Sequence, residues 1–442
     1  MRKGVRIFSA VLVMAWCAAC GNNVTNPTKT SFQNYSSLTP PIPPVMGGSV
    51  QGTQLPLAFK NITSVTVSTI AGTAGSSGSS DGGSTTVRFG LANGITADGK
   101  NLFIADFSNN TIRKYSFSNH STTTIAGIGG VASSNPVLNT DSSLFSAFGS
   151  SAGGAGNAYF NGPSGITTTD GKNLYVADQN NSTIRKIAIA FRNSSTVVTT
   201  IAGVPGSLGS VDDPVGVNAR FNHPTDITTD GTNLYVTDSG NLTIRKIGLT
   251  PPYPVWTIAG SPGVSGANPL FPSTVSGSDA RFQYPARITT DGKNLYVTDF
   301  VKNTVSMIAV KQNGQSKSNV VSTIAGTPVF GSTPGVSGST DGIGGAASFS
   351  KINGITSDGT NLYVTDCNNN TIRRLTPDGS GNWTVYTIAG TAHLIKTDPT
   401  KTDSYKDGKG PAAQFKFPVG ITTDGTSLYV TDSNNYVIRK IQ

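Results

Sequence analysis

The sequence predicts an all-β protein, a six-bladed β-propeller built from four-stranded blades. Three observations lead to this prediction. A phrase close to TDGTNLYVTDSGNLTIRKI occurs six times, a second phrase, TIAG, also occurs six times, and the chain contains no glutamate. A phrase that returns about every 60–70 residues indicates a repeat architecture. Scarce helix formers, together with abundant threonine, valine, isoleucine and tyrosine, favour strands.

Each repeat contains four short runs that are typical of strands. In the third repeat these runs are Asp226–Thr229, Asn233–Thr237, Thr243–Ile247 and Val255–Ala259. Asp230-Gly231 separates the first two runs and suits a tight hairpin, because glycine tolerates positive φ. The second run is apolar or small on both faces, as expected for a strand buried between two neighbouring sheets. Four strands in each of six repeats give six blades.

The two ends of the sequence supply complementary parts of one blade. The last repeat stops after its third run, Val437–Ile441, and lacks a TIAG phrase. The first TIAG run, Val65–Ala71, stands alone before the first full repeat. We therefore expect Val65–Ala71 to form the outer strand of the last blade and to close the ring.

The repeated residues also resemble a known family. The pattern PxGIT-x-DG-x-NLYV-T/A-D-x-x-N-x-TIRKI, followed by TIAG, resembles the NHL repeat over Asn61 to Gln442. The unit at Arg287–Ala325 departs from it, because TIRKI becomes Thr304-Val305-Ser306-Met307-Ile308, and the unit at Ala92 lacks the leading proline. The resemblance implies a six-bladed propeller of NHL type. It does not imply one function, since propellers include binding modules, scaffolds and enzymes.

The N-terminal residues predict export and a lipid anchor. Residues 1–19 combine three positive charges, an apolar stretch and small residues, and they resemble a bacterial lipoprotein signal peptide that precedes Cys20. We expect a lipidated Cys20, a flexible tether over residues 20–60 and the propeller over 61–442. The expected location is the bacterial cell envelope, at the outer membrane or cell surface. Cys17 stands where the lipoprotein pattern usually has leucine, so an ordinary signal cleaved near Ala19 is the alternative.

Charge and cysteine content restrict the function further. Removing Arg2, Lys3 and Arg6 with the signal lowers the formal net charge from +9 to +6, which argues against nucleic acid as a partner. Cys367 would then be the only free thiol. Phenylalanine, glutamine or serine occupies its position in the other repeats, which indicates a packing or rim position and not a nucleophile.

Two charged columns recur along the repeats. The aspartate of YVTD ends the second strand, and the arginine of TIRK begins the third, so the two flank one turn. Because a catalytic site needs one set of groups and not six, we interpret these columns as a structural Asp–Arg brace inside each blade. The exception is the repeat with Ser306 in place of arginine, where Asp299 loses its obvious partner.

The candidate ligand site comes from positions where the repeats differ. Four repeats have glycine immediately before the isoleucine of the first strand, whereas two consecutive repeats have Asp226 and Arg287. Three residues earlier in the same two repeats lie His223 and Tyr284. We hypothesise that these four residues line a ligand pocket at the mouth of the central channel. The alternative is a structural Asp226–Arg287 pair that bridges two blades.

These patterns favour a binding or scaffolding module over an enzyme. Long Gly- and Ser-rich connections after each TIAG lie at one end of the blades, and loops of such length tend to be functional or disordered. We expect a protein or glycan partner on this loop-rich face, a monomeric propeller, no cofactor and no catalytic or metal-binding residue that the sequence identifies. The main alternative is a calcium-dependent lactonase-like hydrolase that uses inner-strand Asn93, Asn353 and Asp226. The Asp-Gly or Ser-Asp-Ala segments before a phenylalanine suggest a shared turn, with calcium as a secondary hypothesis.

Overall fold

The computed structural model describes residues 65–129, 158–190, 196–310, 319–392 and 405–442, all within one compact unit, Val45–Gln442. The predicted signal peptide, lipidated Cys20, tether and residues 61–64 lie outside the described residues. Within these ranges, no helix is long and apolar enough to cross a membrane.

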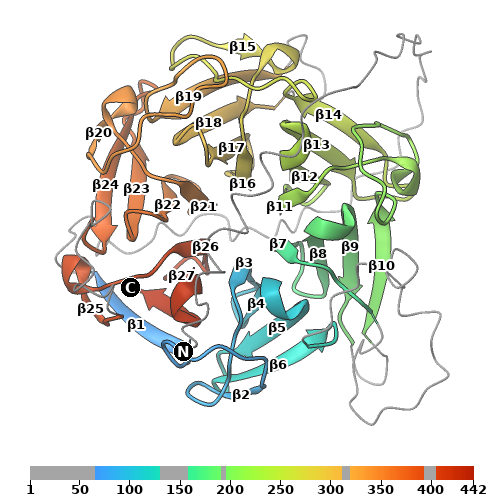
Figure 1. Cartoon of the computed structure of the whole chain (residues 1–442), viewed down its shortest axis with the longest axis vertical. Helices are drawn as coiled ribbons and strands as arrows, with labels where there is room; N and C mark the ends of the chain where they lie inside the picture. The colour runs from blue at the N-terminus through green and yellow to red at the C-terminus, as the bar shows by residue number, and fades with distance from the viewer. Residues whose placement is uncertain (1–64, 130–157, 191–195, 311–318, 393–404) are drawn as a thin grey trace, which may run out of the picture. The chain divides into compact units, whose positions relative to one another are not determined.

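Six antiparallel sheets surround a common centre (Figure 1), which confirms the predicted six-bladed propeller. Blade 1 contains β2 (Gly82–Gly83), β3 (Ala92–Ala97), β4 (Asn101–Asp106), β5 (Thr111–Ser116) and β6 (Ser121–Ala126). Blade 2 contains β7 (Pro163–Thr168), β8 (Asn173–Asp178), β9 (Thr183–Ala188) and β10 (Val197–Ala202). Blade 3 contains β11 (Pro224–Thr229), β12 (Asn233–Asp238), β13 (Thr243–Gly248) and β14 (Val255–Ala259).

The remaining blades follow the same order. Blade 4 contains β15 (Val275–Ser276), β16 (Pro285–Thr290), β17 (Asn294–Asp299), β18 (Thr304–Ala309) and β19 (Val320–Ala325). Blade 5 contains β20 (Gly342–Ile343), β21 (Ile352–Ser357), β22 (Leu362–Asp366), β23 (Thr371–Pro377) and β24 (Trp383–Ala389). Blade 6 contains β25 (Gly408–Lys409), β26 (Pro418–Thr423), β27 (Leu428–Asp432), β28 (Val437–Ile441) and β1 (Thr66–Gly72).

Short 3₁₀ turns complete the pattern. Four follow a second strand directly: η3 (Phe107–Asn109), η6 (Gln179–Asn181), η8 (Ser239–Asn241) and η12 (Ser433–Asn435). Four others precede an inner strand: η7 (Gly216–Asn218), η9 (Gly277–Asp279), η10 (Gly344–Ala346) and η11 (Gly410–Ala412). We call the end of the blades at which the inner strands begin the loop face. The opposite end, which carries the Asp-Gly hairpins, is the turn face.

The N-terminal strand closes the ring as predicted. β1 pairs antiparallel with β28, so that Val67 faces Ile441 and Thr69 faces Arg439. Figure 1 shows β1, in blue, beside the red strands of blade 6. The last blade therefore combines residues from both ends of the described chain.

Four blades have a fifth strand that the sequence did not predict. β2, β15, β20 and β25 are each only two residues long and pair with the outer strand of their own blade. They contain glycine or other residues without strand periodicity, so pattern alone gives no signal for them.

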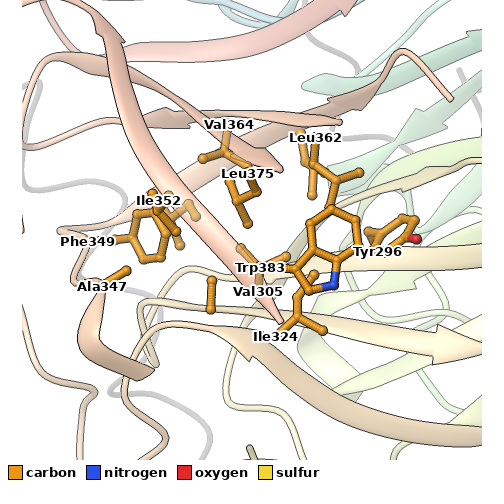
Figure 2. Close-up of a cluster of buried hydrophobic side chains, with 13 residues drawn as sticks. Tyr296, Val305, Ile324, Ala347, Phe349, Ile352, Leu362, Val364, Leu375 and Trp383 are labelled. Atoms are coloured by element: carbon orange, nitrogen blue, oxygen red, sulfur yellow. The ribbon is translucent and has the colours of Figure 1, made fainter. Parts of the chain in front are cut away.

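The hydrophobic core lies between the blades. Six apolar clusters among the described residues each combine side chains of two adjacent blades. In the cluster of Figure 2, Tyr296, Val305 and Ile324 of blade 4 pack against residues of blade 5 that include Phe349 and Trp383. Because each blade is covered on both faces, its second strand is apolar on both sides, as the sequence suggested.

The inner strands approach one another closely around the centre. A Cβ atom on Gly354 would lie 2.2 Å from the Val419 carbonyl oxygen, and one on Gly420 would lie 2.1 Å from that of Asn93. Glycine is therefore required where these backbones meet. Threonines of YVTD add a tie, since Thr365 Oγ1 donates to the Val419 carbonyl at 2.8 Å.

Candidate functional site

The repeated charges form a scaffold, which confirms the predicted brace. In five blades a fully buried arginine pairs with a fully buried aspartate at 2.7–3.1 Å: Arg113–Asp106, Arg185–Asp178, Arg245–Asp238, Arg373–Asp366 and Arg439–Asp432. Burial raises the pKa of Asp238 to about 6, while the Arg245 guanidinium acts in the opposite direction. The side chains of these five pairs are fully buried inside the blades.

The Asp-Gly segments before the phenylalanines belong to the same brace. Asp81, Asp341 and Asp407 of these segments each accept a second hydrogen bond from the buried arginine of their blade, and Asp212 of the Asp212-Asp213 segment does so in blade 3, all at 2.6–2.8 Å. The phenylalanine that follows lies against the same guanidinium, as for Arg245 and Phe221, with 4.8 Å from Cζ to the ring centroid. Asp279 is different, because it lies in η9 and accepts a hydrogen bond from Ser276. The Ser-Asp-Ala segment is thus not equivalent to the Asp-Gly segments.

Blade 4 departs from the brace at several positions together. Ser306 replaces arginine, and the buried Asn268 of the preceding connection donates to its hydroxyl at 3.3 Å. Asp299 stays buried and accepts hydrogen bonds from the backbone amides of Gln283, Tyr284, Val301 and Lys302. Four amides therefore take the place of the arginine that Asp299 lacks.

Lys302 occupies the position at which the other blades have asparagine, and it has a different role. Its side chain is 1% exposed, and Nζ donates to the carbonyls of Val329, Gly331 and Thr333 at 2.6–2.8 Å. These three bonds use all donors of the ammonium group. The segment 329–333, which we call the blade 4–5 loop, is thereby fixed on the loop face, and Phe330 at its tip is 66% exposed.

Apolar side chains on neighbouring connections extend this surface. Leu208, Val264 and Val336 lie on the connections that precede blades 3, 4 and 5, and all three are about half exposed. Ser265 and Ser332 hydroxyls contact each other at 3.0 Å and link two of these connections. Blade 1 has Ser76-Ser77 at the equivalent place. The connections that precede blades 3, 4 and 5 therefore each expose an apolar side chain.

A cavity of about 750 Å³, with polar and apolar groups in its wall, occupies the centre of the ring. Its wall consists of the second halves of the six inner strands and most of the Asp-Gly turns, so it lies toward the turn face. The inner strands are the edges of their sheets and carry backbone groups that no neighbouring strand pairs. Threonine follows the isoleucine in all six: Thr96, Thr167, Thr228, Thr289, Thr356 and Thr422.

The structure divides the four predicted site residues into two pairs. Asp226 and Arg287 line the cavity, whereas His223 and Tyr284 precede β11 and β16 on the loop face and are not among its lining residues. Three residues of extended chain, roughly 10 Å, separate the two levels. The four residues therefore do not line one pocket at one mouth, as predicted, but lie in two separate places. Ligand binding by these residues stays a prediction.

Arg287 bridges three blades at the inner end of the cavity. Nη1 donates to the Thr225 carbonyl at 3.0 Å and lies 3.4 Å from Asp226 Oδ1, while Nε donates to Asn353 Oδ1 at 3.0 Å. Asp226 Oδ2 also accepts from the backbone amide of Ile288. Burial raises the pKa of Asp226, and the nearby guanidinium opposes this shift. The predicted Asp226–Arg287 pair that bridges two blades is thus present, and both of its residues line the cavity.

His223 and Tyr284 contribute to the loop face. His223 has a positive φ, +52°. Lys351 and Phe417, at the equivalent positions of blades 5 and 6, also have positive φ values, +58° and +51°. Bulky residues seldom adopt this left-handed conformation, and such strain concentrates at functional sites. Tyr284 packs on Phe300 with ring centroids 5.9 Å apart, and Lys351 Nζ lies 4.8 Å from the centre of the Phe300 ring.

Cys367 has the packing role that its variability indicated. Its side chain is fully buried, and Sγ donates to the carbonyl of Pro418 in blade 6. Burial raises the pKa of the thiol well above its usual range. Ser239 and Ser433 make the equivalent contact from blades 3 and 6.

Comparisons with known proteins agree with this geometry. The NHL repeat model matches residues 160–187. Protein SUPPRESSOR OF QUENCHING 1, chloroplastic, of Arabidopsis thaliana is 29% identical over 299 residues, which are 64% of this chain and 25% of that protein. The chain thus spans about a quarter of the length of this relative.

Two solved structures share the fold. A structural genomics protein of unknown function from Bacteroides thetaiotaomicron has a TM-score of 0.58 at 19% identity, over 86% of this chain and 76% of that one. An auxiliary nutrient binding protein from the same organism has a TM-score of 0.56 at 15% identity, over the same shares. The chain is a six-bladed β-propeller, and its residues 160–187 match the NHL repeat.

Proposed function

We propose that this protein is an exported, lipid-anchored binding or scaffolding module of the bacterial cell envelope, with a protein or glycan partner on the loop face. The observation that carries this proposal is Phe330, an aromatic side chain that is 66% exposed on a loop fixed by the buried Lys302. A rigid aromatic group loses little conformational entropy on binding and is a common interface anchor.

Two further features support the proposal. Leu208, Val264 and Val336, on the connections that precede blades 3, 4 and 5, are further exposed apolar groups, and such groups mark interaction sites when they form a contiguous patch. A solved structure with the same fold is described as an auxiliary nutrient binding protein. The five Asp–Arg braces, by contrast, are buried inside the blades.

Capture of the partner on intact cells tests the proposal. Phe330→Ser removes the anchor, and Lys302→Asn restores the residue of the other blades and releases the loop, so both are expected to reduce crosslinked partner at least about tenfold. Ile343→Ser, which changes another exposed apolar residue on the outer strand β20, serves as the matched control and should capture like the wild type. Protease treatment or glycosidase treatment of the adduct then distinguishes a protein from a glycan. Equal capture by all four proteins would contradict the proposal.

The lipid anchor has its own test. Cys20→Ser should move the protein from the membrane fraction to the soluble fraction and abolish incorporation of labelled fatty acid, because one acyl chain contributes about 0.8 kcal/mol for each buried CH₂ group. Cys17→Leu, which restores the residue usual in lipoprotein signals, should leave both measurements unchanged. A wild-type protein that is already soluble and incorporates no labelled fatty acid would favour an ordinary cleaved signal peptide without a lipid anchor.

The alternative function, a calcium-dependent lactonase-like hydrolase, stays a prediction. Across the described residues, no group of three or more His, Cys, Asp or Glu side chains is arranged to hold a metal ion. Asn93, Asn353 and Asp226, the residues considered for this role, lie at the start of inner strands, and Asn353 and Asp226 already contact Arg287. No specific observation favours this class over a binding module.

A further inference from the structure

The central cavity has the size and chemistry of a small-molecule site. Its volume of about 750 Å³ falls within the range of about 300–1,000 Å³ that is usual for ligand pockets. The lining includes six threonine hydroxyls for which no hydrogen bond to another described residue is present. No aromatic side chain lines it. Such walls suit a ligand that carries hydroxyl groups over one that is apolar or stacks on rings.

Arg287 breaks the six-fold symmetry of this cavity. It is the only cationic residue in the lining, and it is 4% exposed. Its Nε and Nη1 are engaged by blades 3 and 5, whereas Nη2 has no hydrogen-bond partner within the described part of the chain. A buried guanidinium with an unused donor in a cavity can bind an anionic group, and such charge-assisted bonds are among the stronger ones in proteins.

The other charges of the cavity limit the ligand further. Asp98, Asp170, Asp291, Asp358 and Asp424 lie in the turns at the opposite end of the lining. Asp291 is four residues beyond Arg287, roughly 13 Å along an extended chain. Among the lining carboxylates, Asp226 is the one that contacts Arg287, at 3.4 Å from Nη1. The five in the turns oppose a second anionic group near the turn face.

We propose that the central cavity binds a small hydroxylated acid with one carboxylate, such as a sugar acid. The carboxylate accepts a hydrogen bond from Arg287 Nη2, and the hydroxyl groups contact the threonine ring and the unpaired strand edges. The end that faces the Asp-Gly turns is neutral or cationic. This site is independent of the proposed partner surface on the loop face.

Calorimetric titration of the whole chain with D-glucuronate and D-glucose, in 0.15 M salt, tests the inference. Glucuronate should bind at least about tenfold more tightly than glucose, because a hydrogen bond to a charged group contributes about 1.5–3 kcal/mol. The double variant Asp226→Gly/Arg287→Gly gives all six inner strands the glycine that four of them have, and should lose this preference. Thr289→Val, which removes one wall hydroxyl with little change in shape, should weaken glucuronate binding and leave the melting temperature unchanged.

Three results would overturn the proposal. These are equal affinity for glucuronate and glucose, no binding of glucuronate by the wild type, and full binding by the double variant. If the double variant does not fold, the comparison of the two sugars and the Thr289→Val result still decide.

Discussion

Replacing Arg245 with methionine is expected to lower the free energy of unfolding by about 3–5 kcal/mol, the usual cost of breaking a buried ion pair from one side. Asp238 would remain fully buried with only Asn222 and Asn241 as partners. The Arg220 carbonyl would lose the Arg245 donor, and the Val211 carbonyl would keep only the Arg220 amide as a donor. Guanidinium denaturation at pH 7 and 25 °C measures the change.

The double variant Asp238→Asn/Arg245→Met is the control for this prediction. It removes the uncompensated charge, so a large part of the lost stability should return. A loss below about 1 kcal/mol in the single variant would show that the brace is not a main source of stability.

Removing β1 is expected to have an effect of similar size. A chain that begins at residue 73 loses Val65 and Val67, both almost fully buried, and each such side chain contributes about 1.5–3 kcal/mol. It also leaves β28 as an unpaired edge, which invites aggregation. Because folded domains are stable by only about 5–15 kcal/mol, we expect this chain to lose its cooperative melting transition.

A chain that begins at residue 61 provides the matched control, because it keeps β1 and lacks the predicted tether. It should melt like the protein that begins at residue 20. A synthetic peptide of residues 61–76 added to the shorter chain should restore part of the transition. Identical melting of the chains that begin at 61 and 73 would contradict closure by β1.

The fold was predictable because the same motif, and with it the same pattern of strands and turns, occurs six times in the sequence. The aspartate and arginine that recur at fixed positions of the repeats also predicted the Asp–Arg brace. The incomplete last repeat predicted that the N-terminal strand closes the ring. The two-residue strands β2, β15, β20 and β25 were not predictable, since a strand so short has no periodicity and depends on the neighbour it pairs with.

The site was only partly predictable. Asp226 and Arg287 stand out because four glycines define their column, and the structure places them together. His223 and Tyr284 differ from their equivalents as clearly, yet sequence alone did not show that they lie at another level. The role of Lys302 depends on carbonyls 27–31 residues away. The one available signal was a lysine at a position where the other repeats have asparagine.

The central claim is that the repeated residues hold the fold, whereas the departures on the loop face of blade 4 bind the partner. The most direct test measures denaturation and partner capture side by side, at 10 °C, for Arg245→Met and Phe330→Ser. We predict that Arg245→Met loses stability and keeps capture, and that Phe330→Ser keeps stability and loses capture. If both variants lose capture in proportion to their stability, or if Phe330→Ser captures the partner like the wild type, the claim is contradicted.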